Sequence, residues 1–227
     1  MKFFTSFRKF FLILPLLIFG LVSCDLLNPK EEGPNDLGGD TDLTLSKAGN
    51  TYSADITLDG VKLNLKDSIY IKKNDDGIVT MHISVSTSEL AIKSLIPPEF
   101  TDAQGNIDTD VHFKVTSEGM QDFLYSDQNL SKPFTIVKYA DGTGTKYEFT
   151  SKNGKKVTRE ITEKNGLDEW PLVFWKIKTQ KIEETPDIPG VKKIIYRANH
   201  KYGLVYMEFI LNDDTSVKID LTPWAML

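Results

Sequence analysis

The chain has 227 residues, of which 40% are hydrophobic and 26% are charged, and its formal net charge at pH 7 is −5. A wholly disordered chain would be poorer in apolar and aromatic residues, so this composition predicts a folded domain with a sizeable core. An acidic chain without a block of Lys or Arg is poorly suited to nucleic acid, because neutralised phosphates supply most of that affinity. We therefore expect no nucleic-acid partner.

The N-terminal end has the pattern of a secretory signal peptide. Three basic residues precede an apolar stretch, residues 10–22, and the small residue Ser23 follows it. The apolar stretch is shorter than the roughly 20 residues that a membrane-spanning helix needs. We expect residues 1–23 to direct export and to be removed.

Cys24, the only cysteine in the sequence, lies directly after this segment. The sequence Leu21-Val22-Ser23-Cys24 resembles the lipobox of bacterial lipoproteins, and the resemblance covers only the first 24 residues. It implies diacylglyceryl transfer to the Cys24 sulfur, cleavage between Ser23 and Cys24, and acylation of the freed amine. Two or more acyl chains anchor a protein stably, whereas one binds only marginally. The expected partner is therefore the membrane, through lipid bound covalently to Cys24, with no other cofactor.

The residues after Cys24 bear on the compartment. Asp25 resembles the inner-membrane retention signal of enteric bacteria. Lys30-Glu31-Glu32 instead resembles the charged tract that sends many lipoproteins of the Bacteroidetes to the cell surface. We expect a location in the bacterial cell envelope, with the outer membrane or cell surface favoured and the inner membrane as the alternative.

Residues 28–42 have the composition of a flexible tether. They are rich in Pro, Gly, Asn and acidic residues and contain one large apolar residue, Leu37, so they bury too little surface to order themselves. The predicted organisation is a signal peptide (1–23), a lipidated N-terminus with its tether (24–50) and a single β-rich domain (51–227).

From Thr51 onward, apolar residues alternate with polar ones, which predicts half-buried strands of an antiparallel sheet. The clearest runs place on one face Val61, Leu63 and Leu65; Val79, Met81, Ile83 and Val85; Val205, Met207, Phe209 and Leu211; and Val217, Ile219 and Leu221. Dipeptides typical of hairpin turns lie beside such runs at Asp59-Gly60, Asp76-Gly77, Asp141-Gly142, Asn153-Gly154 and Asn165-Gly166. Helical periodicity is weak and limited to residues 88–96 and 118–126. We predict an all-β domain, an antiparallel sandwich or barrel-like fold of about a dozen strands, with a lipocalin-like barrel as the runner-up.

The sequence shows few signs of catalysis or metal binding. His82, His112 and His200 are not at metal-ligand spacing, there is no G-x-S-x-G motif, and Cys24 is committed to lipid. The acidic run at 102–110 places oxygen ligands on alternate positions, but its glycine, Gly105, precedes these ligands instead of following them, and no glutamate closes a calcium loop. We expect no enzyme activity and no bound metal.

Trp170 and Trp175 are the candidate binding residues. They flank a strand-like run, and exposed tryptophans could stack on a glycan or anchor a protein partner. Val173, Trp175 and Ile177 share a parity, however, which favours a place for Trp175 in the core, where most large aromatic residues lie.

Three functional classes follow from these observations. The favoured one is a membrane-anchored lipoprotein whose non-catalytic β-domain binds a protein, a glycan or a small apolar ligand. The second is a carrier or assembly factor that holds an apolar ligand in a barrel, and the third is an envelope hydrolase that uses carboxylates. A carrier requires a large apolar cavity, and a hydrolase requires a cleft with convergent carboxylates of perturbed pKa. A plain binding module requires neither.

Overall fold

The computed structural model describes residues 37–86, 101–102, 104, 106–151 and 153–225. This part contains β-strands and two short 3-10 helices but no α-helix, which confirms the predicted all-β class. The strands are β1 (Thr51–Leu58), β2 (Val61–Lys62), β3 (Lys66–Asp75), β4 (Ile78–Ser86), β5 (Ile107–Thr116), β6 (Gly119–Asp122), β7 (Phe134–Lys138), β8 (Lys146–Thr150), β9 (Lys156–Lys164), β10 (Trp170–Leu172), β11 (Trp175–Ile177), β12 (Gln180–Thr185), β13 (Val191–Asn199), β14 (Gly203–Leu211) and β15 (Ser216–Trp224). The 3-10 helices are η1 (Thr44–Ser46) and η3 (Leu124–Ser126). None of the described helices is long and apolar enough to cross a membrane.

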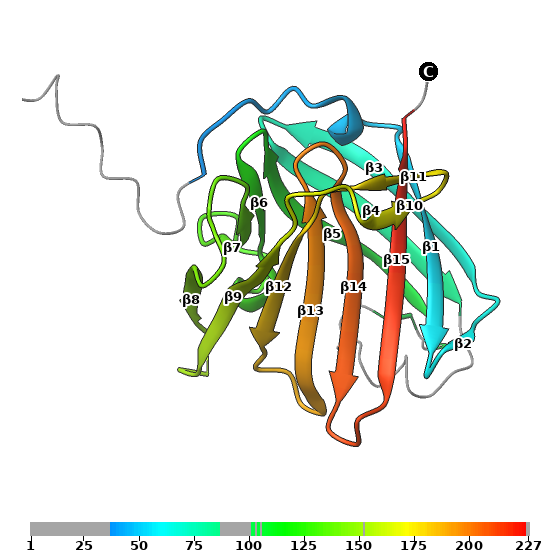
Figure 1. The fold of residues 1–227 in the computed structure, drawn as a ribbon. Coiled ribbons are helices and arrows are strands. Elements are labelled where there is room, and N and C mark those ends of the chain that lie inside the picture. The colour runs from blue at the N-terminus through cyan, green and yellow to red at the C-terminus, as the bar shows by residue number, and fades with distance from the viewer. Residues whose placement is uncertain (1–36, 87–100, 103, 105, 152, 226–227) are drawn as a thin grey trace, which may run out of the picture. The chain divides into compact units, whose positions relative to one another are not determined.

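One antiparallel sheet forms a nearly closed barrel. Its strand order is β7-β6-β5-β4-β3-β1-β15-β14-β13-β12-β9-β8, with β2 paired to β1. The sheet curls so that β3, β4 and β5 lie behind β12 to β15 (Figure 1). The two terminal strands of the sheet, β7 and β8, are linked by a side chain and not by a ladder of backbone hydrogen bonds. The backbone N–H of Lys138 on β7 donates to the hydroxyl of Tyr147 on β8 at 3.0 Å.

Two of the predicted hairpin turns are tight two-residue turns. Asp59-Gly60 joins β1 to β2 with φ values of 47° and 80°, and Asp76-Gly77 joins β3 to β4 with φ values of 50° and 86°. Positive φ at both central residues is what a type I′ turn requires, and it matches the twist of the flanking strands. The Asp-Gly pattern therefore identified these turns correctly.

On β4 and β15, the apolar residues that the alternation predicted to share one face do face the interior of the barrel. Val79, Met81, Ile83 and Val85 of β4 and Val217, Ile219 and Leu221 of β15 all face the interior. The prediction fails in part at residues 61–65, because β2 is only two residues long and Val61 is exposed.

A β-bulge changes the parity of β14. The register between β13 and β14 shifts between Arg197 and Ala198, and Val205 is the extra residue. Leu204 and Met207 line the interior, whereas Val205 is buried on the outer face, under the β10–β11 hairpin. The prediction that Val205 shares a face with Met207 is therefore wrong, because an inserted residue reverses the alternation.

Residues 37–50, which the predicted organisation placed in the lipidated N-terminus and tether (24–50), pack on the barrel. Leu37 is buried, and the backbone N–H of Asp40 donates to Ser117 Oγ at 2.8 Å. Residues 118–126, where helical periodicity was noted, form β6 and η3 instead, because β6 pairs with both β5 and β7. The signal peptide, Cys24 and the possible helix at 88–96 lie outside the described residues.

Candidate ligand cavity

The barrel contains a cavity of about 580 Å³ that is partly open to solvent. Its walls are formed mainly by apolar side chains from β1, β3, β4, β5, β14 and β15, such as Ile56, Ile71, Met81, Val111, Phe209 and Leu221. Each of these side chains points inward because of the two-residue period of its strand. The volume lies within the range of about 300 to 1,000 Å³ that is typical of small-molecule sites.

Side chains fill the barrel unevenly. On β7, β9, β12 and β13, inward-facing residues pack into a core in which Phe134, Val157, Ile161, Ile182 and Ile194 have no exposed surface. On β4, β5, β14 and β15, several inward-facing residues are only partly buried: Met81, Ile83, Val111, Met207 and Ile219. The cavity is the space that these partly buried side chains leave unfilled.

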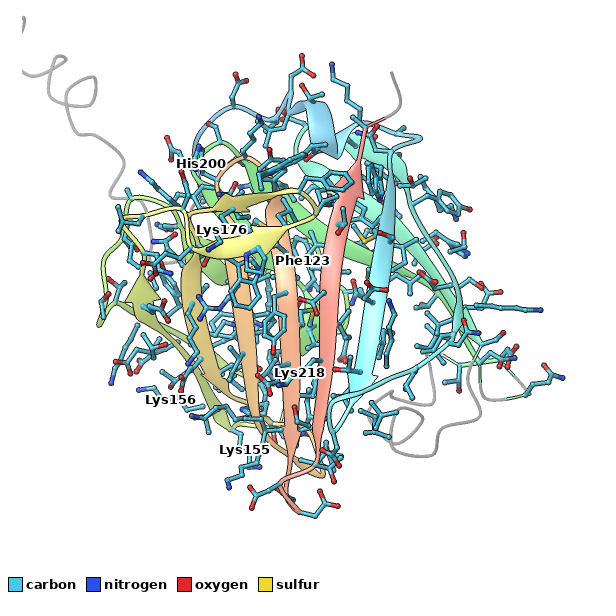
Figure 2. All side chains as sticks on the ribbon, turned by 45° about the vertical axis from the view of Figure 1, so that its right-hand side comes forward. Phe123, Lys155, Lys156, Lys176, His200 and Lys218 are labelled. Atoms are coloured by element: carbon cyan, nitrogen blue, oxygen red, sulfur yellow. The ribbon has the colours of Figure 1, made fainter. Side chains whose placement is uncertain are left out.

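The cavity extends along the barrel axis. Its lining includes His200, at the β13–β14 turn, and Asn153, at the β8–β9 turn. Figure 2 shows His200 at one end of the barrel and Lys155, two residues after Asn153, toward the other. An elongated ligand fits this shape better than a compact one.

Two tyrosines place hydroxyl groups near the His200 end. Tyr52 of β1 and Tyr139, directly after β7, both line the cavity, and the rings of Tyr139 and His200 lie 6.4 Å apart. Burial raises the pKa of Tyr52 to about 12 and also raises the pKa of Tyr139, so both hydroxyls remain protonated donors. Within the described part of the chain, neither hydroxyl has a hydrogen-bond partner. They are available to a ligand.

The buried carboxylates of the barrel are held by Arg159. Its Nε donates to Glu184 Oε2 at 2.6 Å, and its Nη2 donates to Asp122 Oδ2 at 2.7 Å. The hydroxyls of Tyr125 and Tyr196 also donate to Glu184. Burial raises the pKa of Asp122. Asp122 lies at the cavity wall and Glu184 does not, so the two carboxylates do not converge on the cavity as a hydrolase would need.

Trp170 and Trp175 belong to the β10–β11 hairpin, a separate two-stranded sheet outside the barrel. Trp175 is 50% exposed, so its predicted place in the core is wrong. The parity argument failed because Val173 and Phe174 form the turn of this hairpin and do not continue a strand into the barrel. Trp170 is partly covered, with the guanidinium of Arg197 4.4 Å above its ring.

The histidine and aspartate candidates contact protein groups. His82 lies on the outer face, as predicted, with Nδ1 2.9 Å from Asp110 Oδ1. Lys72 donates to the same carboxylate, and Asp102 accepts the backbone N–H groups of Gln104 and Asn106. Within the described ranges, no group of three or more His, Cys, Asp or Glu residues is placed to hold a metal ion.

No protein-family model, curated protein or solved structure matches this chain. The functional argument therefore depends on the cavity and on the chemistry of its lining.

Proposed function

We propose that this protein is a lipid-anchored envelope lipoprotein whose barrel carries an apolar ligand. The supporting observation is the cavity of about 580 Å³ with aliphatic walls. Native interiors are packed as densely as organic crystals and contain few voids larger than a water molecule. A space of this size inside a structured barrel favours an occupant, and this puts the carrier ahead of the plain binding module and the hydrolase.

The lining indicates the chemistry of that ligand. Burial of each methylene group contributes about 0.8 kcal/mol, so an acyl chain of about ten carbons gains roughly 8 kcal/mol before the costs of association. The hydroxyls of Tyr52 and Tyr139 offer two donors at one end of the cavity. The ligand that fits is an amphipathic lipid with hydrogen-bond acceptors, such as ester or phosphate oxygens, at one end of its chain.

The anchor is part of the same proposal. The Leu21-Val22-Ser23-Cys24 segment supports lipid attachment at Cys24, which would keep the carrier beside a bilayer, a source of such lipids. The test is a Cys24→Ala variant expressed in a lipoprotein-processing bacterium. It should incorporate no labelled fatty acid and should leave the membrane fraction. Equal labelling of the variant and the unaltered protein would contradict the anchor.

The carrier function is tested with a fluorescent fatty-acid probe and two adjacent positions on β4. Ile83 faces the cavity and its neighbour Ser84 faces outward, so Ile83→Trp fills the cavity whereas Ser84→Trp is its matched control. We expect Ile83→Trp to weaken probe binding at least tenfold, and Ser84→Trp to leave it unchanged, with circular dichroism confirming that both fold. Lipid should also be extracted from the purified unaltered protein and identified by mass spectrometry. Absence of probe binding to the unaltered protein, or equal binding by a folded Ile83→Trp, would contradict the proposal.

A further inference from the structure

The tip of the β10–β11 hairpin exposes three consecutive apolar side chains to solvent. Its three residues Val173, Phe174 and Trp175 are 46%, 91% and 50% exposed. Single exposed apolar residues are ordinary, but three in succession, two of them aromatic, make a projecting apolar point.

The hairpin holds this tip in a fixed position. Leu172 and Ile177, directly behind the tip, are buried against Val205, the bulge residue of β14. Trp170 packs edge-on against Tyr206, with 5.1 Å between ring centroids. The base of the hairpin is therefore attached to the outer face of the barrel, while Phe174 at its tip is almost fully exposed.

The tip lies beside the end of the cavity that carries the tyrosine hydroxyls. The ring of Trp175 lies 6.4 Å from that of Tyr202, and Tyr202 lines the cavity together with Lys201 and His200. In Figure 2, Lys176 of the hairpin and His200 are at the same end of the barrel. A surface that received the tip would thus also face this end of the cavity.

The chemistry of the tip fits a lipid interface. Tryptophan is enriched at the level of lipid headgroups, where its ring is apolar and its N–H remains wet, and lysines beside it can extend toward the headgroups. Lys176, Lys178 and Lys201 are exposed near the tip, and the exposed Asp168 and Glu169 offset part of their charge. Because the protein as a whole is also acidic, burial of the aromatic rings, and not attraction to anionic lipid, would drive this contact.

A bilayer is also within reach of the domain. The chain makes 13 steps from Cys24 to Leu37, where the described residues begin, and these can span at most about 45 Å even when fully extended. If Cys24 carries lipid, as the proposed function requires, Leu37 at the start of the barrel domain lies within that distance of the lipid anchor.

We infer that Val173, Phe174 and Trp175 insert into the membrane surface and bring the His200 end of the cavity to the lipid from which the ligand is taken or to which it is delivered. This inference depends on the lipid anchor of the proposed function but makes a separate claim, because the anchor alone would leave the orientation of the barrel free.

The test uses the acylated, processed protein, which begins at Cys24, in vesicles of zwitterionic phospholipid. Cys24 is the only native cysteine and its sulfur is acylated, so Phe174→Cys introduces a unique thiol that accepts an environment-sensitive fluorophore. Val61→Cys is the matched control, because Val61 is also an exposed turn-side residue, 65% exposed, and β2 lies at the opposite end of the barrel (Figure 1).

We expect the label at position 174 to shift its emission to the blue and to be quenched at least threefold more by nitroxide-labelled lipid than the label at position 61. The difference should persist at high salt. Solvent-like emission at position 174, or equal quenching at both positions, would overturn the inference and would leave the fatty-acid binding test untouched. A blue shift that needs an added envelope extract and is not quenched by the labelled lipid would indicate a protein partner, and would also overturn it.

Discussion

Arg159 and Glu184 form an ion pair of 2.6 Å in which neither side chain has any exposed surface. The guanidinium also binds Asp122 and donates to the backbone carbonyl groups of Phe134 and Thr135, both at 3.2 Å. One side chain of β9 thus joins β12, the end of β6, and β7. It stabilises the densely packed core of β7, β9 and β12 at the place where the sheet closes.

Replacing Arg159 should destabilise the protein strongly. Arg159→Met leaves Glu184 and Asp122 buried without their counter-ion, and breaking a buried pair in this way costs about 3 to 5 kcal/mol of unfolding free energy. Urea denaturation would measure this. The control is Lys192→Met, which removes an exposed pair with Asp214 and should cost less than about 1 kcal/mol. Similar losses for the two variants would contradict a structural role for Arg159.

Asp122 should make stability fall as the pH rises from acid. Burial raises its pKa in the folded protein, so the folded state holds the proton more tightly than the unfolded state. The resulting stability is fully present below the unfolded-state pKa of about 3.9, and it is lost as the pH rises from there to the raised folded-state pKa. Asp122→Asn has no such proton, so its stability does not include this pH-dependent contribution. As the pH rises through this interval, the urea midpoint of the variant should therefore increase relative to that of the unaltered protein, and the difference should then level off.

Asp110→Asn is the control of opposite sign. The hydrogen bond from Lys72 lowers the pKa of Asp110, so this carboxylate supplies stability above its unfolded-state pKa and loses it as the pH falls. The variant should be less stable than the unaltered protein at neutral pH and equal to it in acid. A pH-independent difference for Asp122→Asn would show that Asp122 does not titrate as its burial implies.

The tyrosine hydroxyls should contribute to binding of a lipid head and not of a hydrocarbon. Tyr52→Phe and Tyr139→Phe each remove one donor while keeping the ring, and a hydrogen bond of about 1 kcal/mol corresponds to roughly a fivefold loss of affinity for a fatty-acid ester. Affinity for an alkane-like probe of the same length should not change. Calorimetry with both ligands would measure this, and equal losses for both would assign the tyrosines to packing only.

Gly119 should tolerate no side chain. A Cβ at this position would lie 2.2 Å from the carbonyl oxygen of Val137 on the adjacent strand. Gly119→Ala must therefore displace β7, at a cost of about 1 to 3 kcal/mol or more, measured as a lower thermal midpoint. Gly142→Ala, which meets no atom within 4 Å, is the control and should leave the midpoint unchanged. An unaltered midpoint for Gly119→Ala would mean that β6 and β7 can separate freely.

The sequence allowed the fold class and much of the sheet to be predicted, because period-two alternation and Asp-Gly turns are local signals. The interior faces of β4 and β15 and the turns at Asp59-Gly60 and Asp76-Gly77 are examples. The bulge at Val205 could not be predicted in this way, because an unpaired residue is identified only by its partner strand. Leu37, the one large apolar residue of the supposed tether, was a signal that could have placed the start of the domain earlier.

The sequence did not predict the cavity itself. It was named only as a feature that a carrier of an apolar ligand would require. Whether inward-facing aliphatic residues meet across a barrel or leave space depends on its diameter, and no local pattern records that. Tyr52 was detectable in principle, because it shares a parity with Ala54 and Ile56 on β1. Tyr139 was not, since it follows β7 in a loop whose path depends on the rest of the barrel.

The closure of the barrel through side chains also bears on aggregation. β7 ends the strand order, and such a strand offers unpaired backbone groups to which another molecule could add a strand. Here Arg159 holds the carbonyl groups of Phe134 and Thr135, and Tyr147 holds the N–H of Lys138. These side chains occupy hydrogen-bonding groups of β7 for which an incoming strand would compete, so the seam that leaves the barrel imperfectly closed also resists edge-to-edge association between copies.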